Sequence, residues 1–354
     1  MSEPLLEVRD LRVTFRSRRG EARAVDGLSF VLDPGEVLGV VGESGSGKSV
    51  SMMSILKLIR DPNCTVSGQA VFRGRDLVTM GDRELRELRG RDISMIFQDP
   101  MTSLTPVYTV GWHIAEALGA HTRISKAAAR NRAVELLEEV GIPDPARRVD
   151  DYPHQFSGGM RQRAVIAMGL ANNPALLIAD EPTTALDVTT QAQILDLLRR
   201  LRRDHGSSII LITHDMGVVS QLADRVLVMY AGRAVEQGPK TEVFHHPRHP
   251  YTWGLLGSVP RARAPRVRRL PAIPGSPASA STAPSGCSFA PRCLHRHDRC
   301  AQQPALLGGL HADACWLPAD RRQELRQSTT AAAIAVGDPG QVVLTERVHT
   351  EAEA

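Results

Sequence analysis

The sequence has few aromatic residues, no strong excess of one charge and no long apolar run. Aromatic side chains make up 4% of the 354 residues, which argues against a protein that stacks on single-stranded nucleic acid. The formal net charge of +4 is too small to indicate a dedicated polyanion binder. No apolar stretch reaches the ~18–20 residues that a membrane-spanning helix needs. The first residues lack the basic and apolar regions of a secretory signal, so we expect a cytosolic protein.

Short apolar runs recur along the first 240 residues and alternate with helical patterns. Apolar runs without polar alternation indicate strands buried on both faces, as in a parallel sheet covered by helices. The runs lie at 37–41, 93–97, 176–179, 208–212 and 226–230. Between them, helical spacing predicts helices from Ser125 to before Gly141 and over about 189–204. This alternation is typical of an α/β domain.

The two ends of the chain differ from this central pattern. Residues 5–15 and 27–31 predict antiparallel strands joined by a basic turn. After about residue 260, a basic run and a Pro/Ser/Ala-rich stretch indicate an extended linker, and a cysteine-rich patch follows at 287–315. The residues from about 327 onward have weak periodicity, and we expect them to be loosely held.

One glycine-rich stretch has the pattern G-x-x-x-x-G-K-[ST] between a predicted strand and a helical stretch. Its glycines let backbone N–H groups surround phosphate oxygens, and the following helix adds its positive N-terminal end. We expect Lys48 to reach the β- and γ-phosphates of a nucleotide and Ser49 to ligate Mg²⁺. The alternative, an ordinary Gly/Ser turn, is disfavoured by the strand–loop–helix context. The stretch consists of Gly42, Glu43, Ser44, Gly45, Ser46, Gly47, Lys48 and Ser49, and Val50 continues it into the helix.

Polar residues follow the predicted strands at the edge where open α/β sheets bind ligands. Asp180 and Glu181 end the run LLIADE, and we expect Asp180 to contact Mg²⁺ and Glu181 to be the general base for the attacking water. Gln98 follows ISMIF and is a candidate for the Mg²⁺ shell or for orienting water. His214 follows SIILIT and is a candidate for holding the γ-phosphate. Taken singly, Gln98 and His214 are more often strand-end residues bonded to a loop, so the prediction depends on convergence with Lys48.

A second glycine pair opens another helical stretch. Ser157 precedes Gly158 and Gly159, and Met160 follows them. Such a helix start is a second anion-binding end. One nucleotide needs only one phosphate loop, so the spare anion site indicates a nucleotide held by another subunit. The alternative is a simple helix cap.

These motifs, in this order, resemble the ATP-binding subunits of ABC transporters over about residues 5–240. The resemblance rests on the phosphate loop, Gln98, FSGGM at 156–160, LLIADE at 176–181, TALD at 184–187 and His214. The signature of the family is usually LSGGQ, and Phe156 and Met160 depart from it. The serine and two glycines that would touch phosphate are retained, so the departure leaves the expected ATP binding intact.

The resemblance implies an ABC-type P-loop ATPase fold with a mixed sheet core, an antiparallel β subdomain and a helical subdomain at about 100–170. We therefore expect an ATPase domain over 1–260, a linker and four-cysteine extension over 261–326, and a loose tail over 327–354. The family also implies that two ATPase domains face head to tail. Each ATP would then lie between the phosphate loop of one domain and the SGG helix end of the other.

Two further residues take their expected roles from the resemblance alone. Asp187 in TALD would lie at the seam between the two ATPase domains. Phe15 matches the aromatic residue that stacks on adenine in this family. A core position at the end of a strand is nearly as good an explanation for Phe15.

Longer stretches are similar to the ATPase subunits of dipeptide and oligopeptide importers, a group that also includes nickel and glutathione importers. They are GESGSGKSV, IFQDPMTSLTPVYTVG at 96–111, YPHQFSGGMRQR at 152–163 and HHPRHPYTWGLL at 245–256. The resemblance implies an ATP hydrolase, peripheral at the cytoplasmic face of the cell membrane, that powers import through two permease subunits. It also implies a sister ATPase in a heterodimer rather than a homodimer, and an extracytoplasmic peptide-binding protein. Residues 100–108 would lie near the part that grips a permease.

Four of the five cysteines fall close together, with the spacing C-x5-C-x6-C-x14-C. Clustered thiols in a reducing compartment indicate a metal or a cluster rather than disulfides. Structural zinc usually has C-x₂₋₄-C pairs, which are absent here, and an iron–sulfur cluster fits about as well. The importer group is associated with a [4Fe–4S] centre on a similar pattern, which favours that cluster, with zinc and unligated thiols as alternatives. The four residues are Cys287, Cys293, Cys300 and Cys315.

Two other classes of function compete with transport. The first is a non-transport ABC ATPase that acts on nucleic acid, which the mild charge and the lack of a long insertion before the SGG motif disfavour. We therefore expect no nucleic-acid partner. The second is a redox-regulatory module built on the cysteine patch, which nothing in the sequence requires.

Overall fold

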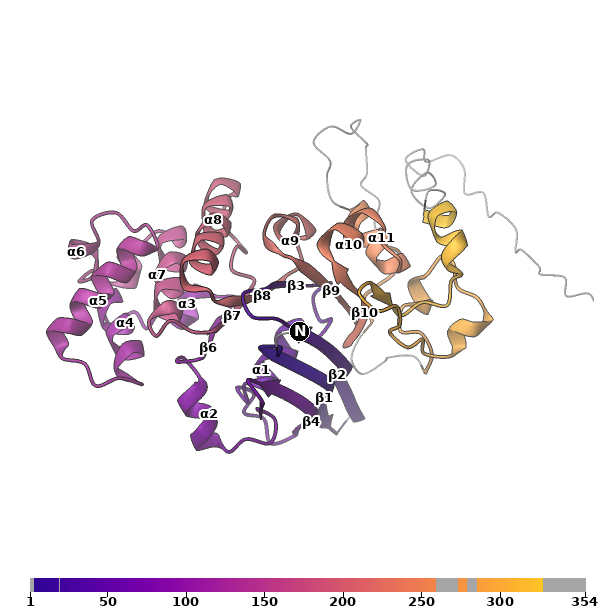
Figure 1. Cartoon of the computed structure of the whole chain (residues 1–354), viewed down its shortest axis with the longest axis horizontal. Helices are drawn as coiled ribbons and strands as arrows, with labels where there is room; N and C mark the ends of the chain where they lie inside the picture. Colours follow the sequence, from indigo (N-terminus) through magenta and orange to yellow (C-terminus); the bar gives the residue numbers. More distant parts are fainter. Residues whose placement is uncertain (1–2, 19, 259–272, 279–284, 327–354) are drawn as a thin grey trace, which may run out of the picture.

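Two β-sheets of different kinds form the framework of this computed structural model, which describes residues 3–18, 20–258, 273–278 and 285–326 (Figure 1). The larger sheet has the strand order β11-β10-β9-β3-β8-β7-β6, and the smaller has the order β2-β1-β4-β5. The larger sheet contains β3 (Val37–Val41), β6 (Ile93–Ile96), β7 (Leu176–Asp180), β8 (Ser208–Thr213), β9 (Arg225–Tyr230), β10 (Arg233–Pro239) and β11 (Ala312–Asp313). The smaller contains β1 (Leu6–Ser17), β2 (Gly20–Leu32), β4 (Cys64–Phe72) and β5 (Arg75–Asp76).

The five strands expected from apolar runs are confirmed as neighbours in the larger sheet. The pairs β6–β7, β7–β8, β8–β3 and β3–β9 are all parallel. Every residue of β3, β7 and β8 is buried, because helices or the smaller sheet cover both faces. Parallel pairing brings the carboxyl ends of these strands to one edge, and the polar residues that follow the strands are gathered there.

Several helices begin or end close to this edge of the larger sheet. Helix α1 (Lys48–Ile55) starts at the phosphate loop, and α9 (Met216–Leu222) follows β8. Helix α8 (Val188–His205) is capped by Asp187 and ends at Gly206, whose left-handed conformation closes the last turn. Helices α10 (Lys240–His245) and α11 (Pro250–Gly257) follow β10 along the chain.

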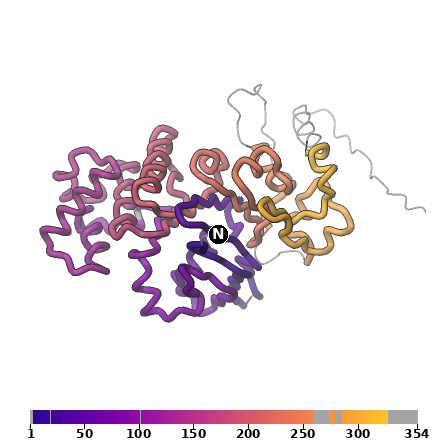
Figure 2. The backbone as a smooth tube through the Cα atoms, viewed as in Figure 1, coloured from indigo at the N-terminus to yellow at the C-terminus, as the bar shows by residue number. Residues whose placement is uncertain are grey.

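A group of helices lies to one side of both sheets, at the left of Figure 1 and of the tube in Figure 2. The group contains α3 (Pro100–Ser103), α4 (Val110–Gly119), α5 (Lys126–Glu139), α6 (Pro145–Arg148) and α7 (Gly158–Leu170), and α2 (Asp82–Leu88) lies below it. Ser125 caps α5 as expected, accepting a hydrogen bond from the N–H of Ala128 at 3.2 Å. This group occupies the range predicted for a helical subdomain, although the domain boundaries themselves remain predictions.

The antiparallel sheet differs from its prediction in one respect. Strand β2 begins at Gly20, whereas the apolar pattern placed its start at residue 27. Residues 20–24 are exposed or half-buried, so they carry no apolar signal. Their backbone nevertheless pairs with β1, down to Ser17 opposite Gly20. An apolar sequence pattern reflects only which side chains are buried, so it does not detect a strand segment whose side chains face solvent.

The C-terminal extension is attached to the larger sheet through β11, which pairs with β10. The fully buried carboxylate of Glu236 is the main polar anchor: it accepts hydrogen bonds from the N–H groups of Arg248 and His249 and contacts the His311 ring at 2.8 Å. These partners offset the cost of burying a charge. The predicted tail at 327–354 and most of the predicted linker lie outside the described residues.

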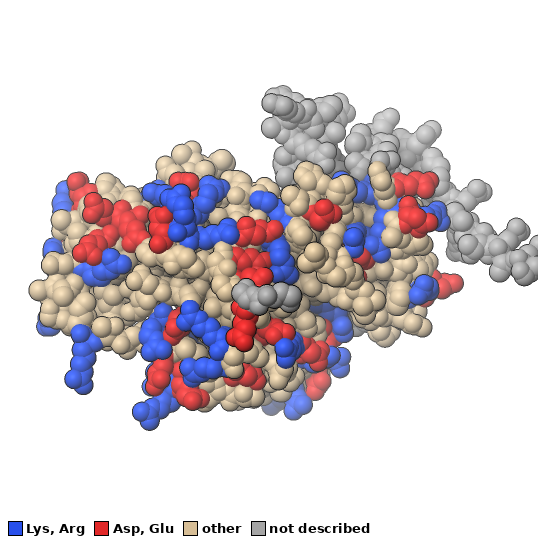
Figure 3. Space-filling view, in the orientation of Figure 1, with Lys and Arg blue, Asp and Glu red and all other residues tan. Residues whose placement is uncertain are grey.

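The surface carries charges of both signs. On the face drawn in Figure 3, Lys and Arg are interspersed with Asp and Glu over both sheets and the helices. No helix in the described ranges is long and apolar enough to cross a bilayer.

Candidate nucleotide-binding site

The glycine-rich stretch forms a loop between β3 and α1. Gly45 and Gly47 have φ values of 77° and 98°, in the left-handed region that favours glycine. At Gly47 there is also no room for a side chain, because a Cβ would lie 2.4 Å from the carbonyl oxygen of Ala24. The backbone therefore curls tightly into the N-terminus of α1, where free N–H groups favour an anion.

Lys48 lies across this loop. Its Nζ donates hydrogen bonds to the carbonyl oxygens of Gly42 at 2.7 Å and Glu43 at 3.0 Å. Burial lowers the pKa of Lys48, although the carboxylates of Glu181, Asp180 and Glu43 oppose that shift. The ammonium is thus held at the loop by weak carbonyl partners, which phosphate oxygens could replace.

The hydroxyl of Ser49 and the carboxylate of Asp180 face each other, with Ser49 Oγ donating to Asp180 Oδ1 at 2.8 Å. Burial raises the pKa of Asp180, and the hydrogen bond from Ser49 opposes the rise. A hydroxyl and a carboxylate are the oxygen ligands that Mg²⁺ prefers. The two side chains therefore fit the magnesium site expected beside the phosphate loop.

Glu181 is at the centre of a polar network. Its carboxylate accepts hydrogen bonds from Gln98 Nε2 at 3.1 Å and Thr184 Oγ1 at 2.7 Å, and it lies 3.1 Å from Nδ1 of His214. Burial pushes its pKa upward, but the hydrogen bonds from Thr184 and His214 and the charge of Lys48 hold the pKa below the ordinary value. The side chain is therefore ionised at neutral pH, as a general base requires.

The backbone of Glu181 is strained. Its φ of 48° is in the left-handed region, which costs energy for a residue with a Cβ. Such strain persists where the surrounding structure holds a residue in place, and it concentrates at functional sites. The turn aims the carboxylate back over the edge of the sheet, toward Gln98 and His214.

These side chains line one cavity of about 780 Å³. This volume is in the range of small-molecule sites. The cavity brings together the start of the phosphate loop and three of the four polar residues that the sequence placed at strand ends; the fourth, Asp180, is not among the lining residues. The lining is Gly42, Glu43, Ser44, Gln98, Glu181, Thr184, His214, Leu255, Ser258, Ile273, Gly275, Pro277 and Arg292.

The second anion-binding end lies elsewhere. Ser157 caps α7, accepting from the N–H of Met160 at 3.3 Å, and a Cβ at Gly159 would lie 2.6 Å from Thr190 Cγ2. Among the described residues that line the cavity, none comes from 157–160. Asp187 is the exposed N-cap of α8 and accepts from the N–H of Thr190 at 3.0 Å. The structure therefore keeps the SGG helix end apart from the phosphate loop of its own chain.

Phe15 is half-buried near the end of β1 and packs against the core between the two sheets. It is not among the described residues that line the cavity. Its stacking on adenine remains a prediction from the resemblance. The contacts that Phe15 makes in the structure are with the hydrophobic core.

The four clustered cysteines are half-buried free thiols. Burial raises the pKa of Cys293 to about 12 and that of Cys315 to about 11, and the neighbouring thiols add to both shifts. Although the thiols interact, no group of three or more His, Cys, Asp or Glu in the described residues is arranged to hold a metal ion. The structure therefore does not support the predicted iron–sulfur cluster.

Among the residues that the sequence analysis did not assign to the site, three contact predicted site residues. Thr184 belongs to the TALD turn and donates a hydrogen bond to Glu181, whereas the sequence analysis assigned a role in this turn only to Asp187. Tyr251 accepts a hydrogen bond from the backbone N–H of Glu43 at 2.8 Å, and Arg292 binds the Glu43 side chain. The last two are about 200 positions or more from the loop, and no local pattern signals such contacts.

The fold and this site together define an ATPase of the ABC class. A family model described as "ABC transporter" matches residues 25–184. Among solved structures, the chain is similar to the cassette MJ0796, described as a dimer in a post-hydrolysis state bound to ADP and Pi. The TM-score is 0.60 at 28% identity, covering 66% of this chain and 98% of that one.

A second model, "Oligopeptide/dipeptide transporter, C-terminal region", matches residues 235–300. The oligopeptide transport ATP-binding protein OppD of Bacillus subtilis is 57% identical over 81% of each chain. The dipeptide transport ATP-binding protein DppD of the same organism is 51% identical over 91% of this chain and 97% of its own length. The chain therefore belongs to the family of ATP-binding subunits of oligopeptide/dipeptide ABC importers, whose ATP hydrolysis is coupled to transport.

Proposed function

We propose that this chain binds Mg·ATP at Gly42–Ser49 and hydrolyses it with Glu181 as the general base, to drive import of short peptides. One observation carries the proposal: the Glu181 carboxylate, which contacts Gln98, Thr184 and His214, lines the same cavity as the first residues of the phosphate loop. Uptake of a labelled dipeptide by cells that depend on this transporter tests it. Native chain should restore uptake and a Glu181→Gln variant should not; equal uptake contradicts the proposal.

The residues would divide the chemistry as follows. Lys48 would exchange its carbonyl partners for phosphate oxygens, and Ser49 with Asp180 would hold a magnesium ion, which would supply positive charge to the phosphates. Glu181 accepts a proton from the attacking water. Gln98 and His214, bonded to the same carboxylate, orient that water and the γ-phosphate.

The second anion site would serve a partner. Because the SGG helix end lies away from the phosphate loop in its own chain, we propose that it covers a nucleotide bound to the facing subunit, with Asp187 at the seam. The dimeric form of MJ0796 supports this arrangement. The partner would be a sister ATPase in a heterodimer, and the pair would act at the cytoplasmic face of the membrane, with two permeases and an extracytoplasmic peptide-binding protein.

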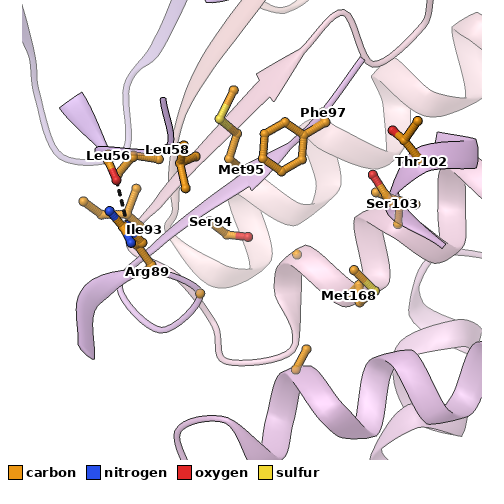
Figure 4. A pocket seen from close by; sticks show the side chains of 14 residues that line it. Leu56, Leu58, Arg89, Ile93, Ser94, Met95, Phe97, Thr102, Ser103 and Met168 are labelled. Atoms are coloured by element: carbon orange, nitrogen blue, oxygen red, sulfur yellow. Dashed lines mark hydrogen bonds between the residues drawn. The ribbon is translucent and has the colours of Figure 1, made fainter. Parts of the chain in front are cut away.

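A groove lined in part by β6 is the proposed permease site. It has a volume of about 380 Å³ and lies between the larger sheet and the helical group, with Met95, Phe97 and Met168 presenting apolar atoms (Figure 4). Between the groove residues Ser103 and Ala117 in the sequence, Tyr108 and Trp112 stack at 3.9 Å although both are exposed. Exposed aromatic residues beside an apolar groove are typical of protein interfaces. We propose that a cytoplasmic helix of a permease occupies this groove.

Blocking the groove should prevent assembly. Thr102 is exposed and lines the groove, so Thr102→Arg would place a charge where the permease helix packs. We expect at least ~10-fold less permease to co-purify, because an unpaired interfacial charge costs 1.4 kcal/mol or more. Asn131→Arg, which adds the same charge on the exposed face of α5, is the matched control and should retain assembly. Equal recovery of permease with both variants would remove the groove from its role.

For the cysteine patch we propose that Cys287, Cys293, Cys300 and Cys315 ligate a [4Fe–4S] cluster. The support is the C-x5-C-x6-C-x14-C spacing of the four cysteines and its similarity to the pattern of the importer group. Chain purified without oxygen should contain iron and acid-labile sulfide in equal amounts, and Cys293→Ser should lose both, whereas Cys64→Ser should not. Zinc in place of iron, or no metal at all, would contradict the cluster.

A further inference from the structure

The C-terminal extension reaches into the nucleotide site through one ion pair. Arg292, from the extension, forms a two-pronged contact with Glu43 of the phosphate loop: Nη1 lies 2.5 Å from Oε2, and Nη2 lies 3.1 Å from Oε1. The Arg292 side chain is only 4% exposed. A buried, bidentate arginine–carboxylate pair is a strong and geometrically specific contact.

Arg292 is fixed from several sides. Its Nε donates to the carbonyl oxygen of Pro274 at 2.7 Å, and the guanidinium lies 5.8 Å from the ring centre of Tyr230, on the core strand β9. Tyr251 holds the backbone of Glu43 with a separate hydrogen bond at 2.8 Å. The extension therefore holds the side chain of Glu43 through Arg292, and helix α11 holds its backbone through Tyr251.

The charge of Glu43 creates a problem for a triphosphate. The residue lines the same cavity as Gln98, Glu181 and His214, where the γ-phosphate would lie. An uncompensated carboxylate there would repel the ligand. Burial alone would lower the pKa of Arg292, but its hydrogen bonds to Glu43 raise it above the ordinary value, so the guanidinium stays charged and offsets the carboxylate.

We propose that Arg292 is a positioning residue for nucleotide binding: it neutralises Glu43 and holds the first turn of the phosphate loop in place. The inference rests on the proposed ATP site. Its consequence is that the C-terminal extension is part of the nucleotide site, because ATP binds tightly only when the extension is docked and Arg292 is paired.

The test is a double-mutant cycle on ATP affinity and steady-state kinetics of the full chain. Arg292→Gln leaves Glu43 uncompensated, and we expect about tenfold weaker Mg·ATP binding. KM for ATP should rise by the same factor while kcat changes little, because Arg292 does not touch the Glu181 network. Arg292→Lys keeps the positive charge but loses the bidentate contact with Glu43, and it should bind Mg·ATP almost as tightly as native chain. In the Arg292→Gln background, Glu43→Gln removes the unpaired charge and should restore affinity to within about threefold.

A matched control comes from the same extension. Arg322 pairs with Asp313 at 2.8 Å, also largely buried, but away from the loop. Arg322→Gln should leave ATP affinity unchanged. If Arg292→Gln binds ATP as tightly as native chain, the inference is wrong. It is equally wrong if Arg322→Gln weakens binding as much, or if Glu43→Gln gives no rescue, because the role of Arg292 is then structural. Failure of native chain to bind ATP would instead overturn the proposed function.

Discussion

Glu181→Gln is expected to lower ATP turnover by roughly 10²–10⁴-fold, the range that a general base contributes. Gln has nearly the same shape and can keep a contact with Thr184, but it cannot accept a proton from water. In the native chain, the hydrogen bonds from Thr184 and His214 outweigh burial and keep Glu181 ionised above its lowered pKa. Turnover should therefore be lost without loss of ATP binding, and phosphate release under saturating Mg·ATP measures it.

A control variant distinguishes loss of the general base from nonspecific damage to the protein. Glu135 is an exposed carboxylate on α5, far from the cavity lining, and Glu135→Gln should turn over ATP at the native rate. If Glu181→Gln retains more than about a tenth of native turnover, another group supplies the base and the assignment is wrong.

Lys48→Ala is expected to weaken Mg·ATP binding by about 10²-fold or more, because hydrogen bonds to a charged group contribute about 1.5–3 kcal/mol each. The lysine is 6% exposed and already lies over the loop, bonded to Gly42 and Glu43. Its removal leaves phosphate charge facing only backbone N–H groups. Equilibrium binding of a fluorescent ATP analogue is the measurement.

Lys57 offers the matched comparison. It follows α1 in sequence and donates to the carbonyl oxygen of Met80 at 2.6 Å, outside the cavity. Lys57→Ala should bind the analogue as native chain does. Unchanged affinity in Lys48→Ala, with the fold intact by circular dichroism, would refute the phosphate-loop assignment.

The parallel core was predictable from the sequence because strands covered on both faces are apolar at every position. Strands β3 and β8 are buried throughout. Because the strands are parallel, the polar residues that follow them lie at the same edge of the sheet. That is why Asp180, Gln98 and His214 could be placed near the phosphate loop before any contact was known. The start of β2 was misplaced because its first residues face solvent and pair only through the backbone.

The long-range contacts were not predictable in the same way. Arg292 and Glu43 are brought together by the docking of the extension, and nothing near either residue indicates the other. The cysteine spacing indicated a shared neighbourhood, which the thiol interactions agree with, but spacing alone does not determine whether the sulfur atoms point at a common centre. Such arrangements depend on turns and loops whose geometry has no simple periodic signal.

The most direct test of the central claim is a structure of the Glu181→Gln variant, in complex with its ATPase partner, with Mg·ATP bound. The account predicts the β- and γ-phosphates against the backbone N–H groups of the phosphate loop, with Lys48 moved onto them. It also predicts that the SGG helix end of the facing subunit covers the same nucleotide. A triphosphate bound elsewhere, or a loop that keeps Lys48 on its own carbonyl groups with ATP present, would contradict it.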